Sequence, residues 1–491
     1  MLKGEEIMKI AVMCDMHLPE NENAPQYDYF YRAVDYLENS DAQTVVVIGD
    51  ITACGGKKAF KRYCEAMKEL HHITISGNAD VRTENPDLLA YACGGEINCG
   101  RRILCLNTPF SRIEENDFAK ISALSDGDII MIHHSLTGLE EKSRNMLEDI
   151  LNSKELILIH AHFHGFSDRT VGKSRVICVK ALDGDKCIGT PPCITLFDID
   201  ENKFSFYEKC FGVSKSEVAD FRDYMGVCCF DLDETIEYAI KNGIKNLELK
   251  KLSREETDIV AVCERIKRFR ESGGRTLSMH MPNLRFDGEN IIDTNWDFAI
   301  ELAKATGIEQ FTIHPPRISV AQMREKAEIF IDYLCDFMRQ FPDAKFGFEN
   351  LHMNKNDVTD EIRGYGMIPE ETLGIVDAVN KRLGAEKCGC VLDVGHAYNN
   401  RAYTGEYPIG VWYATVGNRT IAYHIHQVKR IDGVLHNHRG IDEWFGPMIS
   451  YSSFFHAWRS GLINKCPAFF EMRCFDDVKA SLASYEALEE V

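Results

Sequence analysis

Five apolar segments in the first third of the chain each end in residues that can bind a metal ion. They are followed in turn by Asp15-Met16-His17, Asp50, Asn78-Ala79-Asp80, His133-His134 and His160 to His164. Such apolar runs predict buried strands, and parallel strands bring their carboxyl ends to one edge of a sheet. Carboxylate, carboxamide and imidazole ligands without thiolates suit manganese, iron or zinc. The pattern therefore predicts a metal centre at that edge.

The segment from Leu156 to Gly165, LILIHAHFHG, has the highest density of such residues. Side chains two residues apart in an extended segment lie on the same face, so we expect His162 and His164 to reach one metal cluster together. By itself the segment is more typical of a histidine-rich turn, by roughly two to one. The four other strand ends favour the metal centre.

Taken in order, Asp-x-His, Gly-Asp, Gly-Asn-x-Asp, His and His-x-His resemble the calcineurin-like metallophosphoesterases over about the first 210 residues. The resemblance implies one metal held by Asp15, His17, Asp50 and His164, and a second held by Asp50, Asn78, His133 and His162. Asp50 is then the bridging ligand, and His134 is the alternative to His133. Two cations roughly 3.5–4 Å apart would activate a water and neutralise phosphate oxygens, with Asp50, Asn78 and His133 as catalytic residues.

One position departs from this family pattern. Many members have a histidine after Gly-Asn that assists the leaving group, whereas this chain has Ala79. The sequence therefore does not identify the residue that donates a proton to the leaving group.

The elements that position these residues alternate between strand and helix from Lys9 to Asp80, which predicts a mainly parallel sheet. Helices are expected at Tyr27–Leu37, Lys57–Leu70, near Phe118 and at Glu140–Leu151, and a hairpin-like stretch at Gly95–Thr108. The sequences DGDK and DIDENK are interpreted as hairpin turns. With the family resemblance, this predicts a four-layer α/β-sandwich domain over residues 8–212.

After a polar linker at Lys209–Tyr224 the chain changes to a regular strand–helix repeat. Eight strands are expected: Met225–Phe230, Asn246–Lys250, Thr276–Pro282, Gln310–Pro315, Lys345–Leu351, Gly389–Val394, Ile421–Val428 and Ala468–Arg473. Eight strands alternating with helices over about 250 residues predict a (β/α)8 TIM barrel, here residues 222–478. We expect each of the two domains to fold alone.

The ends of these barrel strands also carry ligand-type residues. They are His280, His314, Glu349, Asp393 with nearby His396, His424 with His426, and Glu471. Because barrel function is built at the carboxyl ends of the strands, the set predicts a second metal site. Glu248, on the second strand, either lines the same mouth or is an inner hydrogen-bonding partner.

The segments VLDVGHAY and YHIHQV are the most specific part of a resemblance to xylose-isomerase-like barrels, from about Gly226 to Phe475. This group includes sugar-phosphate isomerases and epimerases and the endonuclease IV repair enzymes. The isomerase pattern implies one metal held by Glu349, Asp393, His424 and Glu471, with Glu349 and Glu471 moving protons on a sugar. The nuclease pattern adds His280, His314, His396 and His438, although His436 replaces its acid in the acid-x-His pair.

The charge and cysteine content of the chain indicate which classes of molecule it binds and in which compartment it lies. Lys and Arg total 56 against 76 Asp and Glu, a net charge of -20, which disfavours nucleic acid and favours small phosphorylated substrates such as sugar phosphates. The 18 cysteines are scattered without a CxxC pair, which is typical of a reduced, cytoplasmic protein. No apolar run is long enough for a membrane span, and we expect Met8 to be the natural start.

The sequence therefore predicts a metal-dependent phosphoester hydrolase joined to a sugar-phosphate isomerase- or epimerase-like barrel. The expected cofactors are two divalent metals in the first domain (Mn, Fe or Zn) and one or more in the barrel (Mn, Mg or Zn). Two alternatives stay open: a nucleic-acid-processing enzyme with phosphoesterase and AP-endonuclease centres, and a barrel that only binds and regulates. The oligomeric state is left open.

Overall fold

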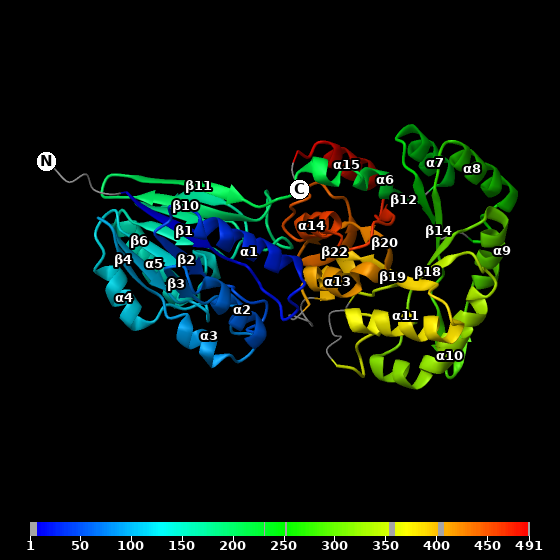
Figure 1. Cartoon of the computed structure of the whole chain (residues 1–491), viewed down its shortest axis with the longest axis horizontal. Coiled ribbons are helices and arrows are strands. Elements are labelled where there is room, and N and C mark those ends of the chain that lie inside the picture. Colours follow the sequence, from blue (N-terminus) through cyan, green and yellow to red (C-terminus); the bar gives the residue numbers. More distant parts are fainter. Residues whose placement is uncertain (1–6, 230, 251–252, 353–358, 401–406, 490–491) are drawn as a thin grey trace. The chain divides into compact units, whose positions relative to one another are not determined.

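A computed structural model describes residues 7–229, 231–250, 253–352, 359–400 and 407–489 (Figure 1). The chain forms two compact units. The first contains the chain up to Ser214 together with Glu443–His456, and the second contains Lys215–Asp442 and Ala457–Leu488. The expected domain limits, 8–212 and 222–478, stay a prediction. The expected start at Met8 concerns residues 1–7, of which residues 1–6 lie outside the described residues.

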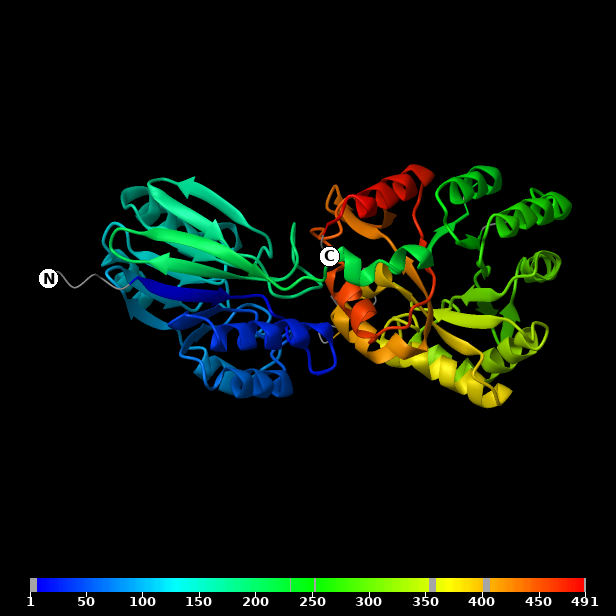
Figure 2. The same ribbon diagram turned by 45° about the horizontal axis from the view of Figure 1, so that its top comes forward.

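Two sheets form the centre of the first unit. One has the order β11-β10-β1-β2-β3, with β1 parallel to β2 and antiparallel to β10; the other has the order β4-β5-β6-β7-β9-β8 (Figures 1 and 2). The strands are β1 Met8–Met13, β2 Thr44–Ile48, β3 His72–Ile75, β4 Gly95–Asn98, β5 Arg102–Leu106, β6 Ile129–Ile132, β7 Ile157–His160, β8 Ser167–Val171, β9 Ser174–Cys178, β10 Cys193–Ile199 and β11 Phe204–Cys210.

The alternation of side chains along β1 shows how the layers form. Ile10 and Val12 pack against the second sheet, whereas Ala11 and Met13 pack against helices on the opposite face. Helices α1 (Pro25–Glu38) and α2 (Lys57–Met67) cover the first sheet, and α4 (Glu115–Ser122) and α5 (Glu141–Ser153) cover the second. The predicted four-layer sandwich is confirmed. A short helix α3 (Pro86–Tyr91) and the 3-10 turn η1 (Leu136–Gly138) complete the element order.

One of the two expected hairpin turns is wrong. DIDENK does join the antiparallel strands β10 and β11. DGDK, in contrast, connects β9 of the second sheet to β10 of the first, because β9 pairs with β7 and β8 while β10 pairs with β1 and β11. The turn therefore crosses between the sheets near their edge, where its first residue, Asp183, joins the candidate metal centre.

Two thiols differ from the expectation of reduced cysteines. Cys193 and Cys210 form a disulfide, because they lie opposite each other in the antiparallel pairing of β10 and β11. The other cysteines are free thiols, most of them buried. The buried free thiols pack as small apolar side chains.

The second unit is a closed parallel barrel of eight strands in the order β12-β13-β14-β17-β18-β19-β20-β23. The strands are β12 Met225–Cys228, β13 Asn246–Leu249, β14 Thr276–His280, β17 Gln310–Ile313, β18 Lys345–Glu349, β19 Cys388–Asp393, β20 Thr420–Ile425 and β23 Ala468–Phe470. Every predicted barrel strand is present, so the TIM barrel is confirmed. The helices between them are α7 Leu232–Lys241, α8 Ile259–Glu271, α9 Trp296–Thr306, α10 Val320–Met338, α11 Pro369–Leu383, α12 Val394–Asn399, α13 Ile409–Val416, α14 Ser452–Ser460 and α15 Phe475–Glu486.

Three details of the barrel were not predicted. Hairpins β15–β16 (Arg285–Asp287, Asn290–Ile292) and β21–β22 (Gln427–Ile431, Val434–Arg439) extend from the strand ends. The expected seventh strand is therefore shorter, because Gln427 already pairs in the hairpin. The expected linker contains the end of β11, the turn η2 (Lys215–Val218) and helix α6 (Phe221–Tyr224).

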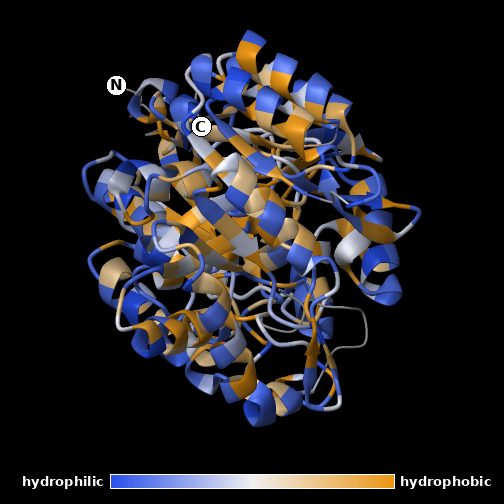
Figure 3. Ribbon diagram, turned by 90° about the vertical axis from the view of Figure 1, so that its right-hand side faces the viewer, coloured by the Kyte–Doolittle hydropathy of each residue, from blue (hydrophilic) through white to orange (hydrophobic). Residues whose placement is uncertain are grey.

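The barrel interior is closed by small and aromatic side chains. Cys228, Val391, Ala422 and Phe469 form one buried cluster across it. Helices of this unit carry both hydrophobic and hydrophilic residues (Figure 3), as expected when one face of each helix packs on the barrel. Glu349, Asp393 and His280 are the last residues of their strands, so their side chains reach the mouth. Among the described residues, the longest and most apolar helices still fall short of a membrane span.

Candidate metal centres

The loops that carry the first centre have an unusual backbone. Asp15, His17, Asp50, His162 and His164 all have positive φ, between 43° and 73°. Non-glycine residues in this region cost about 1–3 kcal/mol each and persist where the surrounding structure holds them, most often at functional sites. The strain therefore falls on the residues that the sequence proposed as ligands.

The backbone conformation of these loops also differs from one prediction made from the sequence, that His162 and His164 lie in an extended segment. His162 and His164 follow the end of β7 in left-handed backbone, so the extended geometry assumed for them is wrong. They point into different groups: Asp15, His17 and His164 form one set, and Asp50, His133 and His162 form another. Within each set the possible ligand atoms lie within 4.8 Å of one another.

Asp50 lies between the two sets. Its Oδ2 is 3.1 Å from Nε2 of His17, and its Oδ1 is 3.5 Å from Nε2 of His133. Each carboxylate oxygen therefore faces a different set, which is the geometry that a bridging ligand needs. The backbone N–H of Ala79 donates to Oδ1 at 2.7 Å and holds the carboxylate in this position.

The remaining expected ligand, Asn78, joins the second set. Its Oδ1 is 3.2 Å from Nε2 of His133, whose Nδ1 lies 2.9 Å from the carbonyl oxygen of Ile48. Gly49, with φ of 88°, allows this approach, because a Cβ there would lie 2.7 Å from Nδ1 of His133. The structure thus brings together all seven ligands expected in this domain.

The neighbouring histidines lie outside the two sets. His134 contacts the hydroxyls of Thr108 and Ser111, and burial lowers its pKa to about 3. His160 is buried beside the carbonyl oxygen of Ala161, and burial lowers its pKa to about 4. Both imidazoles are therefore neutral near pH 7. Of the His133-His134 pair, only His133 has the position expected of a ligand.

The donor set fits divalent metal ions. Asp15 is fully buried, yet its Oδ1 has no hydrogen-bond partner among the residues that the structure describes. Its Oδ2 accepts from the backbone N–H of His162 at 3.2 Å. A buried carboxylate oxygen without a partner is costly unless a cation compensates it.

The pKa of Asp50 also indicates that this site needs positive charge. Burial opposes its ionisation, but the imidazoles of His133 and His17 outweigh burial and hold the pKa of Asp50 well below its usual value. The pKa of His133 rises to about 9, because Asp50 and Asp15 outweigh the effect of its own burial. The Asp50 carboxylate therefore remains anionic, and it needs positive charge from protonated imidazoles or from metal ions.

Asp183 is a site residue that the sequence analysis missed. Its Oδ2 lies 3.3 Å from Nδ1 of His17, which leaves Nε2 of that ring facing Asp50. A carboxylate behind a metal-binding histidine orients the ring and raises its basicity. The signal was present in the DGDK turn, but the turn was interpreted as a hairpin.

We expect Asp183→Asn to weaken metal binding at the first centre about 10–100-fold, because outer-sphere partners of metal-binding histidines typically contribute this much. The measurement is metal titration of chelator-treated protein by calorimetry. Asp185→Asn is the matched control, since Asp185 is also buried and, like Asp183, accepts a hydrogen bond from Nε2 of Gln26, whereas the contact with His17 is made by Asp183. An unchanged affinity in Asp183→Asn would exclude a role for this carboxylate in orienting His17.

Glu349 is the centre of the second site. Its Oε2 lies 3.2 Å from Nε2 of His280, 3.1 Å from Nε2 of His314 and 3.3 Å from Nδ1 of His424. Its Oε1 has no hydrogen-bond partner among the described residues, although the side chain is fully buried. Burial opposes ionisation, but His314 and His424 hold the pKa of Glu349 well below its usual value. The group fits a divalent metal by the same reasoning as Asp15.

Glu471 and Glu248 face opposite sides of His424. Oε2 of Glu471 lies 3.1 Å from Nδ1, and Oε2 of Glu248 lies 2.9 Å from Nε2. Glu248 also accepts hydrogen bonds from Ser278 and Thr312 and is fully buried, so it is the inner partner rather than a residue of the mouth. It orients His424 with Nδ1 towards Glu349 and Glu471.

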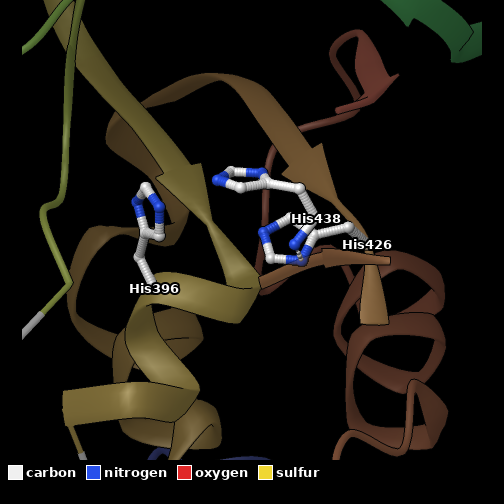
Figure 4. Close-up of side chains that lie close together, drawn as sticks. All are labelled: His396, His426 and His438. Atoms are coloured by element: carbon white, nitrogen blue, oxygen red, sulfur yellow. Dashed lines mark hydrogen bonds between the residues drawn. The ribbon is translucent and has the colours of Figure 1, made fainter. Parts of the chain in front are cut away.

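Asp393 lies beside the second group of histidines. It caps helix α12 by accepting from the backbone N–H of His396, and both its oxygens lie within 3.2 Å of Nε2 of His426. Burial opposes its ionisation, but His396 and His426 lower its pKa to about 2. His438, from hairpin β21–β22, completes the group with His396 and His426 (Figure 4). The structure thus brings together all eight ligands expected in the barrel and adds His426.

Cavities open at this mouth of the barrel. One of about 880 Å³ is lined by Lys250, His280, Asn283, Arg473 and Glu471 among others, and one of about 400 Å³ by Arg317, Glu349, His396 and His438 among others. Nζ of Lys250 also donates to Glu471 at 3.2 Å. The size suits a small molecule, and the cationic side chains suit a phosphate group on it.

Comparisons with known proteins define the class of each domain. Residues 8–185 match the family model for calcineurin-like phosphoesterases, and residues 236–480 match that for the xylose isomerase-like TIM barrel. The first half of the chain is therefore similar to the first family, and the second half to the second. Both families are metal-dependent, and the match to the first supports a hydrolase.

Three solved structures illustrate the similarities. A dimetal phosphatase from Danio rerio has 12% identity and a TM-score of 0.33, covering 41% of this chain and 95% of its own. Endonuclease IV from Thermus thermophilus has 18% identity and a TM-score of 0.37, covering 54% and 98%. A D-tagatose 3-epimerase-like protein has 18% identity and a TM-score of 0.35, covering 54% and 97%. No curated protein sequence matches the chain.

Proposed function

We propose that the N-terminal domain hydrolyses a small phosphate ester with two divalent metal ions. The observation that carries this proposal is Asp50, whose two oxygens face the two ligand sets. Asp15, His17 and His164 would hold one ion, and Asn78, His133 and His162 the other, with Asp50 shared. When bound, the ions supply the charge that activates water and neutralises phosphate oxygens.

The residues of the chain contribute orientation and charge. Asp183 fixes the ring of His17, and the carbonyl oxygen of Ile48 fixes the ring of His133. Ala79 contributes only its backbone N–H, so the leaving group receives no proton from a side chain at this position. Substrates whose leaving group needs no protonation, such as aryl phosphates, should therefore be cleaved fastest.

The test is a panel of phosphomonoesters and phosphodiesters offered to the full chain with manganese, iron or zinc. We expect turnover that disappears after chelation and returns with metal. Within the panel, rates should rise as the pKa of the leaving group falls. Absence of turnover on every ester, with metal bound at the first centre, would refute the proposal.

For the barrel, we propose metal-dependent chemistry on a phosphorylated small molecule. Two reactions were expected, and they differ in the number of ions. A single ion with Glu349 and Glu471 would serve proton transfer on a sugar phosphate, whereas two or three ions would serve phosphoester cleavage. The contacts of His280 and His314 with Glu349 favour the second reaction, because they add nitrogen ligands that proton transfer does not require.

The net charge of -20 argues for a small substrate in the barrel rather than a nucleic acid. Assay of the full chain against sugar phosphates, for isomerisation and for phosphate release, separates the two reactions. An abasic duplex at low salt is the third substrate. Tight binding and cleavage of that duplex would instead favour the repair-nuclease alternative.

A further inference from the structure

A segment from late in the sequence is buried in the first unit. Glu443–His456 follows hairpin β21–β22 along the chain, and the expected domain limits 8–212 leave it out, yet it packs in the unit that holds the first metal centre. Ser450, Ser452 and Ser453 in its middle are each at most 1% exposed. Polar groups buried this deeply are normally hydrogen-bonded, so their partners indicate what the segment contacts.

The partners lie in and beside the DGDK turn, Asp183–Lys186. The backbone N–H of Ser450 donates to the carbonyl oxygen of Asp185 at 3.2 Å. The backbone N–H of Ser453 donates to the carbonyl oxygen of Gly184 at 3.3 Å. A Cβ on Gly184 would lie 2.5 Å from Oγ of Ser453, so the turn and the segment fit together without spare room.

The opposite side of the same turn contacts the first metal centre. The backbone N–H of Asp183 donates to the carbonyl oxygen of Asp15 at 3.0 Å, and its Oδ2 lies 3.3 Å from Nδ1 of His17. Just beyond the turn, the backbone N–H of Ile188 donates to the carbonyl oxygen of His164 at 3.3 Å. The turn therefore lies between the segment and three expected ligands of one ion.

Helix α1 fixes the segment from a second side. The hydroxyl of Tyr29 donates to the carbonyl oxygen of Ser452 at 3.1 Å and lies at the same distance from Oγ of that residue. Nε2 of His456 lies 3.5 Å from Oδ2 of Asp28, on the same helix. The segment is thus held by α1 on one side and holds the DGDK turn on the other.

We propose that Glu443–His456 positions the first metal centre: it holds the DGDK turn so that Asp183 orients His17 towards a metal ion. The inference rests on the metal centre of the proposed function and extends it to a segment far along the chain. Groups behind a metal ligand must be held within about 0.5 Å of their working position, and close packing provides this. Ser450 and Ser453 are positioning residues, since they act on the metal through Asp183.

The competing interpretation is that the segment only adds to the stability of the first unit. Crowding it would then lower the thermal midpoint, and every bound ion would be affected alike or not at all. The proposal predicts a selective effect instead. The ion at His17 should bind more weakly, whereas the ion at His133 and those of the barrel should bind as before.

Metal titration of the chelator-treated full chain by calorimetry tests the proposal. Ser453→Val adds bulk where Gly184 lies closest, and it should weaken the same binding step as Asp183→Asn by about 10-fold, the lower end of the range for an outer-sphere partner. Tyr29→Phe removes one hydroxyl, keeps the ring and should cause a smaller weakening of that step. Ser460→Val is the matched control, because Ser460 is an exposed residue of the same helix, α14.

The double variant Asp183→Asn/Ser453→Val identifies the route. If the segment acts through Asp183, the second substitution adds nothing to the first. Additive effects, equal weakening of every step, or unchanged affinity in a folded Ser453→Val protein would each overturn the proposal. Should circular dichroism show that Ser453→Val does not fold, unchanged affinity in Tyr29→Phe overturns it equally. Metal affinity needs no turnover, so absence of hydrolysis on every ester would count against the proposed activity alone.

Discussion

Asp50→Asn should lower phosphoester hydrolysis by more than the roughly 10–100-fold that loss of an outer-sphere partner costs at metal sites. The substitution keeps the size of the side chain but removes the charge that both ligand sets share. One oxygen of Asp50 lies 3.1 Å from His17 and the other 3.5 Å from His133, so both ions would lose a common anionic ligand. The measurement is kcat on the best ester of the panel at saturating metal.

Two controls make this result specific. Asp168→Asn removes a carboxylate of the same domain that pairs with Arg175 at the surface, and it should leave kcat unchanged. Metal analysis of Asp50→Asn shows whether the loss comes from weaker binding or from slower chemistry. Near-normal turnover in a folded Asp50→Asn protein would contradict the bridging role.

Glu349→Gln should remove the metal at the centre of the barrel and abolish its chemistry. Three imidazoles lie within 3.3 Å of one oxygen of Glu349, and its other oxygen has no hydrogen-bond partner among the described residues. A neutral amide provides no anionic oxygen and turns an N–H₂ group towards one side of the site. We expect at least one metal ion fewer per chain, with the ions of the N-terminal domain retained.

Glu328→Gln is the matched control, because Glu328 is an exposed residue of α10 that pairs with Arg382. It should keep the full metal content and the thermal midpoint of the wild type. Retention of phosphoester hydrolysis by the N-terminal domain in Glu349→Gln would show that the loss is local. A full complement of metal in that variant would exclude Glu349 as a ligand.

Most of the fold could be predicted because it depends on local patterns. The period-two alternation of β1 separates Ile10 and Val12 from Ala11 and Met13, and the structure buries these pairs on opposite faces of the sheet. All eight barrel strands appear in the sequence as short, largely apolar and largely buried segments between helices. Hairpin β21–β22 was missed because the apolar run continues through His426 into Val428, although Asp432-Gly433 is a turn signal between its two strands.

The types of ligand, and their order along the chain, were determined by the sequence alone. Asp15, Asp50 and Asn78 follow successive strands, and parallel pairing then forces their side chains to one edge. The same reasoning located Glu349 and Asp393 at the mouth of the barrel.

Only the tertiary structure decided which side chains share a site, because that depends on approaches between segments far apart in the chain. Asp183 reaches His17 since its turn crosses between two sheets, and Glu248 is an inner partner since Ser278, Thr312 and His424 surround it. His426 joins His396 and His438 because a hairpin folds back over the end of β20. Spacing along the chain carries no signal for such contacts, since they arise when strand register, left-handed loops and hairpin geometry act together.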